Sequence, residues 1–121
     1  MAELNLGTLY DMNKTLYDKM PPLSGDELDK AKNLCTNFFA KNYISNTQYF
    51  ALLCNEKKDF TVFANIYRTN PTVWVEDLFD CLNNRGIIKS IEMSEDNYAL
   101  EIWIDNYVYY CFPYDNGVIT Y

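Results

Sequence analysis

The stretch that decides the fold is YALEIWIDNYVYYCFPYDNGVITY, residues 98–121. It holds eight of the chain's 20 aromatic residues (2 Trp, 11 Tyr and 7 Phe), with acidic residues between them and no Lys or Arg. β-Branched and aromatic residues at alternating positions are typical of strands. Asp105-Asn106 and Asp115-Asn116-Gly117 are typical of the turns between strands. The stretch therefore predicts an antiparallel sheet with an acidic, tyrosine-rich surface.

The same period of two extends upstream and predicts a meander of strands over residues 87–93, 98–104, 107–113 and 118–121. Turns at 94–97 and 105–106 set the register. The predicted core face carries Ile87, Ile91, Met93, Tyr98, Leu100, Ile102, Ile104, Tyr109 and Cys111. The reverse face carries Ile88, Ser90, Glu92, Ala99, Glu101, Trp103, Val108, Tyr110 and Phe112.

Two helices are predicted ahead of the sheet. Apolar residues at helical spacing indicate a first helix over residues 4–19, which Pro21-Pro22 ends. Ser24 followed by Glu27 matches a capping box, and an apolar stripe continues from there. We therefore expect a second helix over about residues 25–41.

A β-hairpin is predicted over residues 48–67. Two apolar runs flank the polar connection 55–59, and the first run is apolar on both faces, which predicts a central strand. Asn70-Pro71-Thr72 then predicts the start of a third helix, and Asn84-Arg85-Gly86 its end.

These elements predict a single α+β domain spanning residues 1–121. At 121 residues and 49% hydrophobic content, the chain is long and apolar enough to bury a core. We expect no membrane helix and no signal peptide, because no apolar run is long enough and the first residues lack a basic-then-apolar pattern. The expected location is the cytoplasm.

The net charge of −7 is carried entirely by the last 52 residues. Residues 1–69 contain eight acidic and eight basic residues, whereas residues 70–121 contain nine acidic residues against Arg85 and Lys89. Such a field repels nucleic acid and attracts basic protein surfaces. The alternative is that the acidity serves only solubility.

Catalysis has little support in the sequence. The chain has no His, and its four glycines stand alone and form no phosphate loop. The four cysteines lack metal-ligand spacing, so we expect free thiols and neither a metal nor a cofactor. Glu92 and Glu101 could approach across neighbouring strands like the paired carboxylates of a hydrolase, but no other part of such a site is visible. We predict that the protein is not an enzyme.

Protein binding is the function that the composition favours. Trp and Tyr are enriched at interface hot spots, and the reverse face combines Trp103 and Tyr110 with Glu92 and Glu101. The alternatives are that a helix covers this face or that a second copy of the chain packs on it.

Four segments, LSGDELDKAKNLCTNFF, YFALLCNEKKDFTVF, DLFDCLNNRGIIKSIE and FPYDNGVI, resemble small proteins encoded by phages of low-GC Gram-positive and gut bacteria. Proteins of this kind are similar in character to anti-CRISPR and other anti-defence inhibitors. The resemblance implies a stoichiometric inhibitor that binds a basic, nucleic-acid-handling effector in the bacterial host, with carboxylates in place of phosphates and no direct contact with nucleic acid.

In that mechanism two groups of side chains carry binding. Eight carboxylates mimic phosphates and steer docking: Glu76, Asp77, Asp80, Glu92, Glu95, Asp96, Glu101 and Asp105. The anchoring rings are Trp103, Tyr107, Tyr110 and Tyr114. The alternatives are an immunity or antitoxin protein that neutralises a basic toxin, and a protein that sequesters a small molecule.

Overall fold

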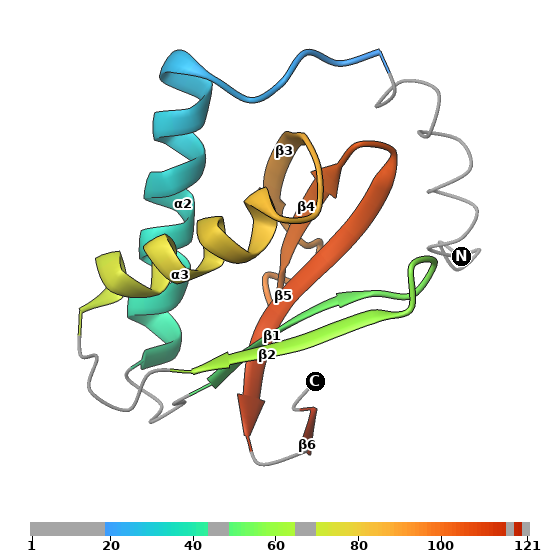
Figure 1. The fold of residues 1–121 in the computed structure, drawn as a ribbon. Coiled ribbons are helices and arrows are strands. Elements are labelled where there is room, and N and C mark those ends of the chain that lie inside the picture. Colours follow the sequence, from blue (N-terminus) through green and yellow to red (C-terminus); the bar gives the residue numbers. More distant parts are fainter. Residues whose placement is uncertain (1–18, 44–48, 65–69, 116–117, 120–121) are drawn as a thin grey trace, which may run out of the picture.

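The structure is a computed structural model that describes residues 19–43, 49–64, 70–115 and 118–119. In these residues two helices, α2 (Gly25–Tyr43) and α3 (Pro71–Asn83), lie against one side of an antiparallel sheet (Figure 1). The predicted mixed α+β class is confirmed. The strands are β1 (Tyr49–Cys54), β2 (Asp59–Ala64), β3 (Ile88–Met93), β4 (Leu100–Ile104), β5 (Tyr107–Asp115) and the short β6 (Val118–Ile119).

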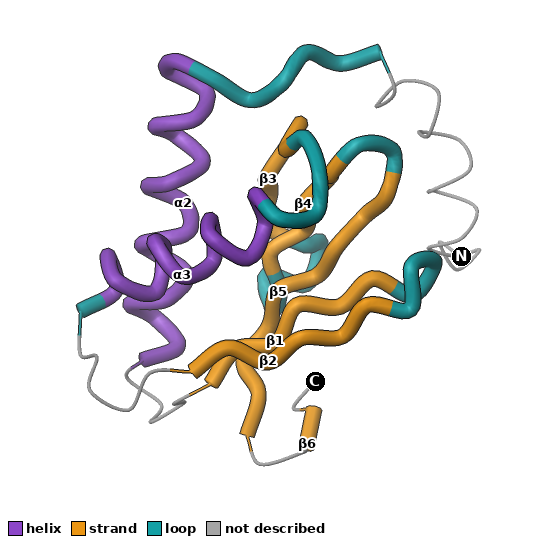
Figure 2. Tube along the Cα trace, viewed as in Figure 1, coloured by secondary structure: helices purple, strands orange, loops and turns teal. Residues whose placement is uncertain are grey.

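The described strands are ordered β2-β1-β5-β4-β3, and β6 pairs with the end of β5 (Figure 2). The strand β1 lies between β2 and β5, as its two apolar faces predicted. Phe50, Leu52 and Cys54 point to the helices, and Ala51 belongs to a separate cluster on the other face. The pairing of β1 with β5 therefore joins the β1–β2 hairpin and the later β3–β4–β5 meander in one sheet.

The number of helices differs from the prediction. The described residues contain two helices rather than three, because the helix expected over 4–19 falls, apart from Lys19, outside them. The second predicted helix is confirmed as α2. The third is confirmed as α3, where the Asn70 side chain caps the helix by accepting a hydrogen bond from the Thr72 backbone N–H at 3.0 Å. Neither described helix could cross a membrane.

The main core lies between the two helices and the sheet. Its centre is aromatic: the Phe50 ring of β1 lies 4.6 Å from Phe39 of α2 and 5.0 Å from Trp74 of α3, centroid to centroid. All three side chains are at most 1% exposed. Burying each such ring stabilises the fold by roughly 1.5–3 kcal/mol, so this cluster holds both helices on the sheet.

Arg85, just beyond α3, ties the helical layer to β2. Its Nε donates to Asp59 Oδ2 at 2.6 Å, and its Nη2 donates to Thr61 Oγ1 at 2.5 Å. Its Nη1 donates to the Cys81 carbonyl at 2.6 Å, which satisfies an acceptor at the end of α3. The sequence had indicated only a solvated turn at Asp59 and a helix stop at Arg85.

The register of the meander is largely confirmed, with one correction. Glu92 pairs with Glu101, and Ile91 pairs with Ile102, but the register shifts between Ile88 and Ser90. This irregularity reverses the facing of the residues before it. Ile88 is consequently buried with the main core, where Ile87 had been expected, and Ile87 is 50% exposed.

Tyr98 was also expected on the core face. It instead packs against Ala51, Ala99 and Phe112, which form a smaller cluster on the opposite face of the sheet. The reason is that β4 begins at Leu100, so Tyr98 belongs to the β3–β4 connection and does not follow the alternation of the strand. Of the strand predicted over 118–121, Val118 and Ile119 form β6, and residues 120 and 121 lie outside the described residues.

Candidate functional site

The sheet face opposite α2 and α3, here called the second face, is covered by neither described helix. One row of paired residues crosses all five long strands on it. In order from β3 to β2, the row is Glu92, Glu101, Tyr110, Leu53 and Phe60. Side chains directly opposite on adjacent strands are close enough to interact. The row therefore runs from two carboxylates through a tyrosine to apolar side chains.

A hollow of about 320 Å³ lies on the second face beside this row. Its strand residues are Leu53, Glu101, Tyr110 and Phe112. The connections between strands contribute the rest of the lining, namely Asn55, Ser94, Glu95, Asp96, Tyr98 and Ala99. Three aromatic rings and three carboxylates thus converge on one concave surface, and the described residues that line it include no Lys or Arg.

The β3–β4 turn is held in shape by its own side chains. Ser94 Oγ donates to Asp96 Oδ1 at 2.6 Å, and the Tyr98 backbone N–H donates to the same oxygen at 3.0 Å. These hydrogen bonds lower the pKa of the Asp96 carboxyl, so Asp96 is ionised at neutral pH. The turn fixes the position of Tyr98 and leaves Glu95 and Asp96 exposed at the rim of the hollow.

Glu101 is the carboxylate within the hollow that the protein shields most from water. Burial raises the pKa of Glu101, the hydrogen bond from Trp103 opposes that rise, and the negative charge of the neighbouring Glu92 adds to it. Trp103 Nε1 donates to Glu101 Oε1 at 3.2 Å and so orients the carboxylate. Trp103 therefore holds the ionised Glu101 in place, although burial removes part of the hydration that stabilises its charge.

The structure corrects the predicted role of Trp103. Its side chain is 2% exposed, so it offers no ring to a partner in this conformation. It supports Glu101 from beneath the surface. The sequence placed Trp103 on the reverse face, which is right, but alternation alone does not tell whether a residue on that face is buried.

The remaining predicted rings divide between the two faces. Tyr110 lines the hollow, and Tyr114 lies on the same face, where its ring packs edge-on against Phe60 at 5.7 Å between centroids. Tyr107 packs instead against the main core on the helix side, with Lys57 Nζ 4.6 Å from its ring centroid. Tyr107 therefore does not join the second face.

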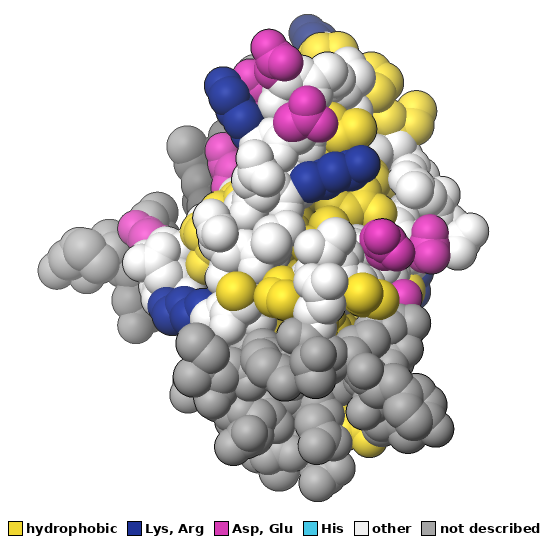
Figure 3. Space-filling model, turned by 90° about the vertical axis from the view of Figure 1, so that its left-hand side faces the viewer, with side chains coloured by type: hydrophobic (Ala, Val, Ile, Leu, Met, Phe, Trp, Pro, Cys, Tyr) yellow, Lys and Arg dark blue, Asp and Glu magenta, His cyan; other side chains and the backbone are white. Residues whose placement is uncertain are grey.

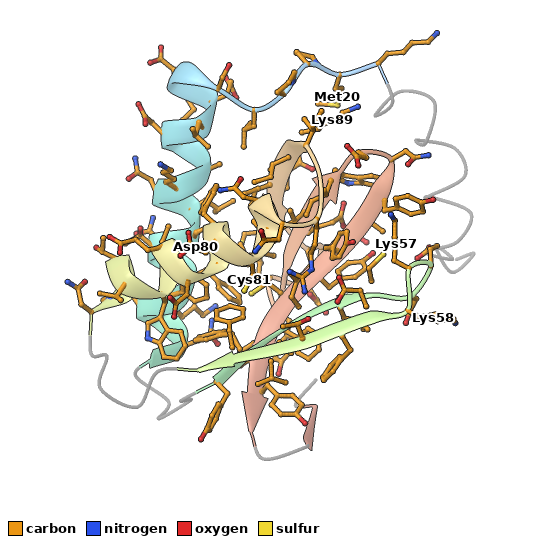
Figure 4. The ribbon with its side chains drawn as sticks, in the orientation of Figure 1. Met20, Lys57, Lys58, Asp80, Cys81 and Lys89 are labelled. Atoms are coloured by element: carbon orange, nitrogen blue, oxygen red, sulfur yellow. The ribbon has the colours of Figure 1, made fainter. Side chains whose placement is uncertain are left out.

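The predicted carboxylates do not form one surface either. Glu92, Glu95, Asp96 and Glu101 gather at or beside the hollow. Glu76 and Asp80 line a groove between α2 and α3 that also contains Lys32, and Asp77 belongs to the same helix. Figure 4 shows Asp80 on α3, on the helical side of the molecule.

The helical side also lacks a uniform charge. Figure 3 shows Lys and Arg side chains interspersed with Asp and Glu over its described surface. Asp105 lies in the β4–β5 turn, at the opposite end of β4 from the hollow, and its Oδ1 accepts from the Ile87 backbone N–H at 3.1 Å. The carboxylate of Asp105 thus serves the local structure.

Two exposed apolar residues of the second face were not predicted as part of a site. Phe60 and Val62 of β2 are 45% and 38% exposed and lie two residues apart on one face of the strand. The signal in the sequence was the alternation within DFTVFA, which places Phe60 and Val62 on one face of the strand. No predicted element covered that face. With Tyr114 they form an apolar margin on the side of the hollow away from Glu92.

The described residues contain no group of three or more Cys, Asp or Glu placed to hold a metal ion. All four cysteines are free, and three of them are buried. Burial raises the pKa of Cys35 to about 12, so this thiol is not a nucleophile at neutral pH. Comparison of the chain with protein-family models, curated proteins and solved structures finds no match.

Proposed function

We propose that the protein is a stoichiometric inhibitor that binds a basic protein through its second face. The observation that carries this proposal is the convergence of Glu95, Asp96 and Glu101 with Tyr98 and Tyr110 around one hollow. Carboxylates raise the rate of encounter with a positively charged surface, and tyrosine is enriched among the few residues that dominate the binding energy of an interface. The apolar margin at Phe60 extends the same surface toward β2.

The resemblance to small phage proteins supports a bacterial defence effector as the partner, such as a CRISPR nuclease or another protein that handles nucleic acid. Such effectors hold phosphates in basic channels. In this proposal Glu92, Glu95, Asp96 and Glu101 take the place of phosphates, and the carboxylates of α3 have no part in docking. The protein then acts in the cytoplasm of the bacterial host, binds no nucleic acid itself and performs no catalysis.

A charge-matched pair of variants tests the surface. The first variant replaces Glu92, Glu95 and Glu101 by Gln. The second removes three exposed carboxylates of the helical side by Glu27→Gln, Glu76→Gln and Asp80→Asn, so both variants lose the same net charge. In pull-downs from host lysate, wild type and the second variant should retain the same partner, while the first variant loses it. Equal loss in both variants would mean that net charge matters and the location of the charges does not.

Salt dependence of the captured complex gives the second test. Because the proposed contacts are charge-assisted and partly exposed, affinity should fall roughly tenfold or more between about 0.05 M and 0.5 M salt. Titration calorimetry of the purified pair measures this. Affinity that does not change with salt would remove phosphate mimicry from the proposal and leave only an apolar interface.

The hollow itself favours one alternative, the sequestration of a small molecule. Its volume of about 320 Å³ and its aromatic lining lie within the range of ligand pockets. A thermal shift with nucleotides or other small ligands, in the absence of any captured protein, would support that function instead. An immunity protein against a basic toxin would use the same surface, and the identity of the captured partner distinguishes it from a defence inhibitor.

A further inference from the structure

We infer that the hollow is a socket for a single arginine side chain of the partner protein. This inference rests on the proposed function, because it names the group that a basic partner would insert. The size of the hollow is the first argument. At about 320 Å³ it is at the lower end of the range for ligand pockets, so it suits one long side chain and is too small for a strand or helix.

The lining has the chemistry that a guanidinium group requires. Tyr98 and Tyr110 supply partly buried aromatic rings, whose faces attract cations, and the buried Phe112 packs beneath them. Glu101 supplies a carboxylate that is oriented by its hydrogen bond from Trp103 and that retains a second oxygen for a donor. Asp96 and Glu95 add negative charge at the rim.

The neighbourhood of Glu101 also favours a cation. Glu92 is paired directly with it on the adjacent strand, and like charges opposite each other are unfavourable unless a positive charge comes between them. The described residues that line the hollow include no basic side chain beside Glu101, whereas Glu92 lines a separate groove together with Lys30 and Lys89. A positive group that enters the hollow would therefore offset the lost solvation of Glu101.

Arginine fits better than lysine. The guanidinium group is planar, stacks on aromatic rings and is weakly hydrated. It therefore loses less hydration free energy than an ammonium group when it enters an aromatic hollow. It also presents several N–H donors and can bond a carboxylate through two of them at once. Lysine offers a compact, strongly hydrated charge, and we expect it to bind more weakly in the same place.

The test is an NMR titration of the full chain with Nα-acetyl-arginine amide. Nα-acetyl-citrulline amide is the matched probe, because it has nearly the same shape and no charge. The arginine probe should shift the Trp103 indole N–H and the backbone signals of Glu101 and Tyr110, with saturation in the millimolar range. Citrulline should bind at least about tenfold more weakly. Equal binding of both probes, or shifts spread over the whole surface, would overturn the inference.

Glu101→Gln gives the matched variant, since it keeps the size of the side chain and an acceptor for Trp103. It should weaken the arginine probe about tenfold, which corresponds to the loss of one charge-assisted hydrogen bond. Glu76→Gln, which removes an exposed carboxylate on the helical side, should leave the binding unchanged. Tight binding to Glu101→Gln would also overturn the inference.

The experiments distinguish failure of this inference from failure of the proposed function. If the arginine probe does not bind but the Glu92/Glu95/Glu101 variant still loses a protein partner, the second face binds its partner without a socket. If the probe binds in the hollow and no protein is captured in a salt-sensitive way, the arginine socket is supported and the inhibitor function is contradicted. Tight binding of free arginine, in the micromolar range, would instead point to a small-molecule ligand.

Discussion

The two faces of the sheet are built from the same strands and differ in almost every property. Toward the helices, Phe50, Leu100, Ile102 and Cys111 are fully buried in one apolar cluster. On the second face their immediate neighbours include Glu101 and Tyr110, which are partly buried and surround a hollow. A step of one residue along a strand moves a side chain from one environment to the other. Alternate residues of one strand therefore differ in burial, and under the proposed function this alternation separates the residues that stabilise the fold from those that bind the partner.

Each face has its own kind of cluster. The helix-side cluster includes residues from both helices and from five strands, and its aromatic centre joins β1, α2 and α3. Among the described residues, the cluster of the second face has three buried members, Ala51, Ala99 and Phe112, with partly buried tyrosines around them. Substitutions on the helix-side face should therefore change mainly the free energy of unfolding. Substitutions on the second face should change mainly the affinity for a partner.

Phe50→Ala should give the largest effect on stability. It removes a fully buried ring between Phe39 and Trp74, and such truncations cost about 3–5 kcal/mol. Tyr110→Ala, on the second face of the neighbouring strand, is the comparison and should cost less than half as much. Urea unfolding followed by circular dichroism measures both. A larger loss for Tyr110→Ala would reverse the assignment of the two faces.

Arg85→Met should have a smaller effect, about 2 kcal/mol, because it removes hydrogen bonds to Asp59, Thr61 and Cys81. Arg85 lowers the pKa of Asp59, so the contribution of the pair is present above the ordinary Asp pKa. It is lost as the pH falls through the lowered value in the folded state.

Unfolding curves at neutral and strongly acidic pH check this prediction for Arg85. The difference between wild type and Arg85→Met should be larger at neutral pH and should shrink in acid. Arg85→Lys is the control, since it keeps the charge without the fork of donors and should recover only part of the loss. A difference that grows as the pH falls would contradict the role given to Asp59.

Glu101→Gln should have the smallest effect on stability, and it should stabilise the protein where the other substitutions destabilise it. Because burial raises the pKa of Glu101, the folded state favours the protonated carboxyl, and this stability is lost as the pH rises through the raised pKa. The substitution should therefore stabilise the protein slightly at pH 7 and have no such effect at low pH. Thermal unfolding at several pH values measures it, with Glu76→Gln as a neutral comparison.

A stabilising Glu101→Gln that also loses the arginine probe would sharpen the comparison of the two faces. It would show that Glu101 favours binding and lowers the stability of the fold. Destabilisation at pH 7 would indicate instead that Glu101 serves the structure through Trp103.

Local pattern was enough to predict much of the fold. The Pro71 and Asn70 signals located α3, and the alternation in β4 and β5 placed Ile102 and Tyr109 on the core face. The pairing of Glu92 with Glu101 followed from the length of the turn between their strands. These features depend on residues that are close in the sequence.

Features that depend on distant residues were missed. Arg85 and Asp59 are 26 residues apart, and no local pattern joins them. The register shift at Ile88 has no marker in the sequence, so Ile87 and Ile88 were assigned to the wrong faces. The acidic surplus was visible as a total, but only the structure divides it between α3, the hollow and the β4–β5 turn.

The position of β2 has a consequence for handling the protein. Among the described strands it pairs with β1 alone, so one side of its backbone is an edge, and it presents Phe60 and Val62 outward. Apolar edge strands are templates for aggregation, which charged residues nearby oppose. Lys57 and Lys58 in the β1–β2 turn are placed as such gatekeepers (Figure 4). Replacing Val62 by Lys should therefore make concentrated solutions of the protein precipitate less readily.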